Sequence, residues 1–138
     1  MLAAVTGFMG GRCTWRGEVA GTEGATVHDA TFIALTNIGP EACLAPNVRG
    51  VHGIGVDGHR VDATAGSYFP IGPPPSPIGP GNRVLLILAT SHRCSGDPVP
   101  APVESVVIRL GDQSSTTVAL RSMIDTACGF GFSALGSA

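Results

Sequence analysis

Four cysteines are the residues of this sequence that bear most directly on chemistry: Cys13, Cys43, Cys94 and Cys128. No two of them form a Cys-x-x-Cys pair, so the spacing typical of zinc ribbons and of thiol redox motifs is missing. An even number of widely spread cysteines favours two long-range disulfides, and therefore an oxidising compartment. The spacing leaves one alternative open, which is four buried free thiols in a cytosolic protein.

The segment GIGVDG, residues 53–58, matches the GxGxxG pattern of dinucleotide-binding proteins. That pattern requires a strand before it and a helix that begins at its third glycine, so that the helix N-terminus meets the pyrophosphate. Here the third glycine belongs to Asp57-Gly58, a dipeptide typical of a two-residue hairpin turn. We therefore predict a hairpin with Val56 opposite His59, and no nucleotide site.

Histidines and serines form no recognisable metal or catalytic pattern. On that hairpin His52 and His59 would lie roughly 13 Å apart, at about 3.4 Å per residue, which is too far to share a zinc ion. The segment GFSALG, residues 131–136, resembles a nucleophile elbow, but it misses the G-x-S-x-G spacing and no helix follows it. We expect Ser133 to be a hydroxyl of a terminal strand, and we predict no catalytic residue, no metal and no cofactor.

Composition narrows the class of protein and of partner. The 138 residues are 43% hydrophobic and 13% charged, with a net charge of −2 and no lysine. Such a chain offers no overall basic surface to neutralise phosphates, so nucleic acid is not an expected partner. The 20 glycines and 11 prolines are spread along the chain and penalise helices, which favours short strands joined by turns.

Strand patterns recur along the chain with turn residues between them. The clearest is the run of five large apolar residues from Val84 to Leu88, which predicts a central strand buried on both faces. The fold that these patterns predict is all-β: an antiparallel β-sandwich of about seven strands, with a barrel as the alternative. The expected strands lie within residues 14–21, 27–39, 47–63, 82–94, 105–122 and 124–135.

A proline-rich stretch, residues 68–81, separates two of these strands. Its prolines remove backbone donors and favour polyproline II. As a linker it would divide the chain into two parts that are each too small to fold comfortably alone. Its P-x-x-P spacings resemble SH3 ligands, but that recognition takes place in the cytosol. We predict a stiff crossover loop, with a docking surface as the next interpretation and a linker as the last.

Exposed aromatic residues beside this loop are the best candidates for contact with a ligand or partner, because aromatic rings offer a large apolar area. The candidate surface consists of Tyr68, Phe69, Pro73, Pro74 and Pro75. The alternative is that the two rings anchor the loop. Trp15, by contrast, is expected to fill the core.

Residues 1–12 are predicted to be a flexible N-terminus or the remnant of an export signal, followed by a single β-sandwich domain over residues 13–138. The apolar run near the start spans about ten residues, which is too short to cross a bilayer. We therefore expect a chain that does not span a membrane.

The order of several short motifs resembles an actinobacterial extracytoplasmic family known as domain of unknown function 4232. The matching positions are Cys13, Thr36-Asn37-Ile38-Gly39, Cys43-Leu44, Asp57-Gly58, Pro80-Gly81, Cys94 and Cys128-Gly129. The chain departs from that family at Ala45-Pro46-Asn47, where a Gly-x-Pro usually follows. It also lacks the aromatic residue that is common before the third cysteine.

This resemblance implies an immunoglobulin-like sandwich on or outside the cell envelope, with no established activity to carry over. It also implies bridges between Cys43 and Cys94 and between Cys13 and Cys128. We therefore expect a secreted or cell-surface, non-catalytic binding or structural module of unidentified ligand. Its partner would be an unknown envelope component or protein, and a monomer is one option. The alternatives are a hydrolase-like envelope enzyme with a site built from loops, or a metal-binding domain.

Overall fold

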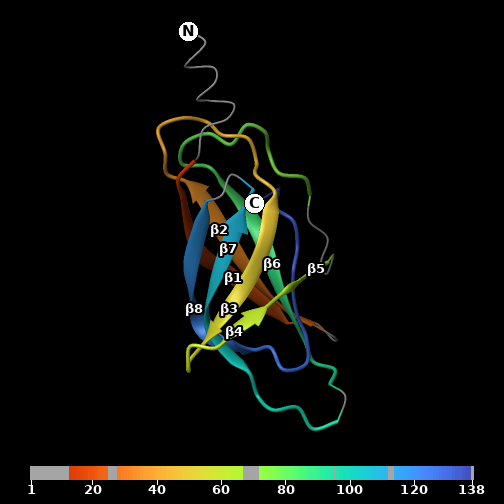
Figure 1. Cartoon of the computed structure of the whole chain (residues 1–138). Helices are drawn as coiled ribbons and strands as arrows, with labels where there is room; N and C mark the ends of the chain where they lie inside the picture. The colour runs from red at the N-terminus through yellow and green to blue at the C-terminus, as the bar shows by residue number, and fades with distance from the viewer. Residues whose placement is uncertain (1–12, 25–27, 67–71, 95, 112–113, 138) are drawn as a thin grey trace.

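The computed structural model describes residues 13–24, 28–66, 72–94, 96–111 and 114–137. Within these ranges every regular element is a strand, and the strands lie over one another in two layers (Figure 1). The strands are β1 (Trp15–Gly24), β2 (His28–Asn37), β3 (Val48–Gly55), β4 (Arg60–Asp62), β5 (Thr64–Ala65), β6 (Arg83–Ser91), β7 (Pro102–Leu110), β8 (Ser115–Asp125), β9 (Phe130–Phe132) and β10 (Gly136–Ser137).

Two sheets account for all of these strands. One follows the order β1-β2-β6-β9-β5, with β10 also paired to β6, and the other follows the order β4-β3-β7-β8. All pairs are antiparallel except β5 with β9. The prediction of an all-β, disulfide-bonded fold with two sheets is confirmed, while its immunoglobulin-like strand order stays a prediction.

The structure has more strands than the sequence suggested, because four of the ten contain only two or three residues. Two of these short strands, β4 and β5, follow each other directly but pair in different sheets. The chain therefore crosses between the layers at Ala63, whose N–H still donates to Val51 O at 2.9 Å. The division of the chain at residue 13 stays a prediction, because residues 1–12 lie outside the described ranges.

Strand β6 is the centre of the hydrophobic core, as the run of apolar residues predicted. Val84, Leu86 and Leu88 point into one cluster with the inner faces of both sheets, while Ile87 on the opposite face is also buried. Its neighbour β2 contributes its alternate residues to the same cluster. Trp15 lies in this core as expected.

Along one side of the sandwich, the outer strands β1 and β8 hold the two sheets together. A Cβ on Gly17 would lie 2.5 Å from Cγ2 of Val118, so this close approach of the strands requires glycine. Arg121 extends the contact by donating from Nη2 to Val19 O at 2.8 Å.

The hairpin at Asp57-Gly58 forms, but its predicted register is wrong by one residue. Gly55 N donates to His59 O, so three residues form the loop and Val56 does not face His59. Within this loop Gly58 has a positive φ, of 85°, as in hairpins that combine a type I turn with a left-handed residue. The carboxylate of Asp57 favours this turn by accepting the N–H of His59 at 3.0 Å, and that bond lowers the pKa of Asp57.

All four cysteines are in disulfides, but the pairing that the family resemblance implied is wrong. Cys13 bonds to Cys43, and Cys94 bonds to Cys128. Strand β6 explains why Cys43 and Cys94 cannot meet. Cys43 pairs with Ile78 just before β6 begins, and Cys94 follows the other end of the strand. Nine residues of strand place those two ends roughly 27 Å apart at about 3.4 Å per residue.

Peptide mapping would test this pairing directly. Trypsin cleaves after arginine, and the chain has no lysine, so the four cysteines fall into the tryptic peptides 13–16, 17–49, 94–109 and 122–138. From unreduced protein we expect mass spectrometry to find the first peptide linked to the second and the third linked to the fourth. A link between the second and third peptides would contradict the structure.

Gly58→Ala should destabilise the fold by about 1 kcal/mol, because a Cβ is disfavoured at positive φ. Chemical denaturation followed by tryptophan fluorescence would measure the change. Gly21→Ala is the matched control, since neither glycine has an atom within 4 Å of a built Cβ but only Gly58 has positive φ. Equal effects of the two substitutions would contradict the turn geometry.

Candidate binding surface around the proline segment

The described part of the proline-rich stretch, residues 72–81, is a loop that leads into β6. We call this stretch the proline segment; the strands before and after it, β5 and β6, belong to the same sheet. The prediction of a loop is therefore confirmed, although neither disulfide encloses it. Both ends of its described part are fixed. Gly72 O accepts the N–H of Ser137 at 3.0 Å, while Ile78 donates to Cys43 O at 2.6 Å and accepts from Cys43 N at 2.9 Å. The side chain of Ile78 is fully buried in the core.

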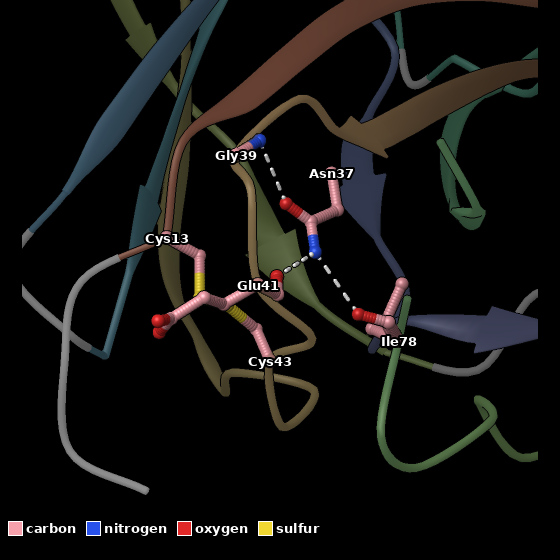
Figure 2. The surroundings of a disulfide bond; sticks show 6 residues. All are labelled: Cys13, Asn37, Gly39, Glu41, Cys43 and Ile78. Atoms are coloured by element: carbon pink, nitrogen blue, oxygen red, sulfur yellow. Dashed lines mark hydrogen bonds between the residues drawn. A yellow bond between two sulfur atoms is a disulfide. The ribbon is translucent and has the colours of Figure 1, made fainter. Parts of the chain in front are cut away.

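Asn37, at the end of β2, holds the second of these anchors in place (Figure 2). Its side chain is 0% exposed, and the amide Nδ2 donates to Ile78 O at 3.0 Å and to Glu41 O at 2.8 Å. Its Oδ1 accepts the N–H of Gly39 at 3.0 Å. One buried amide therefore connects β2, the turn that follows it and the end of the proline segment.

The local sequence explains this arrangement. An asparagine side chain that accepts the N–H two residues ahead forms an Asx turn, which reverses the chain after β2. The turn brings Cys43 back toward the start of β1, where Ile38 N donates to Thr14 O at 3.0 Å. There Cys43 forms its disulfide with Cys13, and the two Cα atoms lie 6.4 Å apart. In Figure 2 the Asn37 amide lies between the Cys13–Cys43 disulfide on its left and Ile78 on its right.

Two grooves flank the consecutive prolines. By the kind of residue that lines each, we name them the apolar groove, of about 770 Å³, and the polar groove, of about 580 Å³. Pro74 lines the apolar groove, whereas Pro73 and Pro75 line the polar groove. The apolar groove is lined by Ala45, Pro46, Asn47, Val48, Ala65, Gly66, Pro74, Phe132, Ala134 and Leu135. The polar groove is lined by Pro73, Pro75, Gly81, Asn82, Arg83 and Ser137.

The three prolines of the predicted ligand surface thus line concave surface, whereas Tyr68 and Phe69 lie outside the described residues. Sequence reasoning missed the opposite wall, which Phe132 and Leu135 supply. The segment around them was expected only as a weak terminal strand. Its parallel pairing with β5 could not be foreseen, because the partner strand has two residues.

The apolar groove carries little reactive chemistry. None of its lining side chains is ionisable, and among these residues Asn47 is the one with a polar side chain. Ser133 lies next to the groove, but its buried hydroxyl accepts Ile87 N at 3.0 Å and donates to Ala134 O at 2.9 Å. That hydroxyl is held by backbone groups, as a structural serine would be.

Two of the histidines, His59 and His92, lie away from the groove and each contacts a carboxylate. His59 Nδ1 lies 2.6 Å from Asp57 Oδ2, and His92 Nε2 lies 2.9 Å from Asp29 Oδ1. Over the described ranges, no three His, Cys, Asp or Glu side chains are grouped so that they could hold a metal ion.

Comparisons with known proteins leave the family open. A scan against protein-family models finds no matching family, and searches of curated proteins and of solved structures find no significant match. The resemblance to domain of unknown function 4232 therefore stays a prediction. In the part of the chain that the structure describes, no helix is long and apolar enough to cross a membrane.

Asn37→Ala should lower the free energy of unfolding by about 2–3 kcal/mol, because three hydrogen bonds are lost at a site that excludes water. Asn37→Asp keeps the size but replaces the donor by an acceptor facing two carbonyls, so it should destabilise at least as much at neutral pH. Urea denaturation would measure both changes. The exposed Asn82→Ala is the control and should change stability by less than about 0.5 kcal/mol. A change that small in Asn37→Ala would contradict the anchoring role.

Proposed function

We propose that this protein is a non-catalytic binding module that works outside the cytoplasm, on or near the cell envelope. The observation that carries the proposal is the apolar groove. Its volume falls in the range typical of small-molecule sites, which are mostly apolar with a few polar groups. Asn47 and the backbone around it would orient the ligand.

The walls of the groove are fixed before any ligand arrives. Pro74 is restrained between two anchored ends, and Phe132 is paired to both Ala65 and Leu88 across the sheet. A site that is already ordered loses little conformational entropy on binding. This rigidity supports a role in binding.

Two disulfides support the location. Disulfides persist in oxidising compartments and are rare in the cytosol. Together with the family resemblance, they favour an envelope component as the ligand. Because the lining is apolar and uncharged, we infer that the groove takes an uncharged amphiphile, with the alkyl part against Phe132 and Leu135.

NMR titration with n-octyl β-glucoside below its critical micelle concentration would test this proposal. We expect shifts confined to the lining of the apolar groove. Ala134→Trp, which places a large ring at an exposed lining position, should abolish them while the rest of the spectrum stays folded. Ala20→Trp, exposed on β1, is the matched control and should leave binding intact.

Shifts spread over the whole surface, or equal effects of the two tryptophan variants, would contradict a site in the groove. Hydrolysis of the glucoside during the titration would contradict the non-catalytic assignment. It would favour the alternative of a hydrolase-like envelope enzyme.

A further inference from the structure

The outer face of the four-stranded sheet gathers three of the chain's eight basic residues, all of which are arginines. Arg109 lies opposite Gly50 in the pairing of β7 with β3, and Arg60 lies opposite Ile54 in the pairing of β4 with β3. Alternation along the strands places both side chains on the face that points away from the core. We name Arg49, Arg60 and Arg109 the arginine patch.

A β-bulge brings Arg49 into this patch. Val48 pairs with Leu110 and Gly50 pairs with Arg109, so Arg49 is the extra residue between two registers. Bulges re-aim side chains and are common beside functional sites. Here the bulge gives one strand two consecutive positions, 49 and 50, beside the same arginine of β7.

Glycine at position 50 makes room for the Arg109 guanidinium. A Cβ built on Gly50 would lie against Nη2 of Arg109 and 3.2 Å from its Cζ. The guanidinium therefore lies against the backbone of β3, and a side chain at position 50 would displace it. Glycine at this position lets Arg109 present its charge close to β3.

Two hollows adjoin at Arg49 and Arg109, which line both of them. One, of about 400 Å³, extends to Ser114 and Ser115 at the start of β8. The other, of about 280 Å³, extends to Arg60 across β3. The patch is therefore a trough with its two shared arginines at the middle.

Charge in this trough is only partly compensated. Arg60 Nε lies 2.8 Å from Asp62 Oδ1, whereas Arg49 and Arg109 have no ion pair or hydrogen bond among the described residues. Among the described residues that line the two hollows, three arginines and one aspartate leave two positive charges, on a chain whose net charge is −2. A surface that keeps two arginines unpaired beside each other is suited to an anion.

His52 lies between Gly50 and Ile54 on the same face of β3, and its pKa responds to the charges of the arginine patch. Partial burial lowers its pKa, and the charges of Arg60 and Arg109 lower it further, while Asp62 acts in the opposite direction. Its Nδ1 is buried and has no partner within the described part of the chain. The same guanidinium groups that would bind an anion therefore add to the effect of burial in favouring the neutral imidazole.

We propose that the arginine patch binds consecutive phosphate groups of a linear phosphate-bearing ligand, with Arg49 and Arg109 contacting the first phosphate and Arg60 the second. Planar guanidinium groups bind phosphate through paired, charge-assisted hydrogen bonds. The two excess positive charges complement the negative charge of adjacent phosphate groups, and the two hollows give each phosphate a place. The lining of the larger hollow has no aromatic side chain, and Phe132, which lines the smaller one, is only 6% exposed, so the described lining offers no open ring on which a base could stack. A phosphate chain without bases therefore fits this surface better than a nucleic acid.

Titration calorimetry with tripolyphosphate at low ionic strength would test the site on the folded chain. We expect Arg109→Gln and Arg49→Gln each to weaken binding about tenfold or more, because each removes charge-assisted hydrogen bonds. Arg16→Gln, exposed on β1, makes the same change in net charge and should weaken binding less than about twofold. Equal losses in all three variants, or no binding by the unaltered chain, would overturn the proposal.

Two comparison ligands test the chemistry of the site. Oligothymidylate with three phosphates should bind more weakly than tripolyphosphate, and so should citrate. A preference for either would overturn the assignment to a phosphate chain without bases. Ala134→Trp, which blocks the apolar groove, should leave tripolyphosphate binding unchanged, so the two sites can fail separately.

The pKa of His52, measured by NMR, gives a second reading of the same site. A bound anion stabilises the imidazolium, so tripolyphosphate should raise this pKa, and Arg109→Gln should raise it in the free protein. The charged groups that face His52 are Arg60 and Asp62 of β4 and Arg109 of β7. An unchanged pKa at saturating ligand would place the phosphate elsewhere and overturn the proposal.

Discussion

The buried amide of Asn37 is the interaction on which this end of the structure depends. A side-chain amide that leaves water without partners is costly, and here three backbone groups from two separate loops satisfy it. The chain that follows Ile78 depends on Asn37 as well. The N–H of Asn37 donates to Asn82 O, and its carbonyl oxygen accepts the N–H of Gly81, just before β6 begins. Neither loop can shift without breaking a bond inside the protein that water cannot replace.

The disulfides secure opposite ends of the same sandwich. Cys13–Cys43 lies beside the Asn37 amide, and Cys94–Cys128 joins the far end of β6 to the start of β9, where Ser91 N donates to Gly129 O at 3.3 Å. Each closes a loop of about thirty residues, for which the chain-entropy model gives roughly 4 kcal/mol of stabilisation. Covalent links at both ends leave the walls of the grooves little freedom to open.

Local patterns in the sequence predicted what depends on local physics. The apolar run of β6 indicated a central strand. Alternation along β2 likewise puts Ile33 and Leu35 on one face, and in the structure that face enters the core. The disulfide pairing was wrong because it depends on which strand ends meet, and strand order is a long-range property. The hairpin register was wrong because one side-chain bond, from Asp57 to the N–H of His59, favours a three-residue loop over a two-residue one. Likewise, the pairing of a two-residue strand leaves no periodic pattern to read.

Net charge is equally uninformative about local charge. The sequence offered no overall basic surface, yet a bulge at Arg49 and a glycine at position 50 bring two arginines together. The same stretch of chain serves both candidate sites, since Val48 lines the apolar groove and the next residue begins the arginine patch. Because of the bulge, Val48 lies at the apolar groove and the next residue, Arg49, lies at the arginine patch. Where β3 departs from regular pairing, it therefore separates an uncharged surface from a cationic one within two residues.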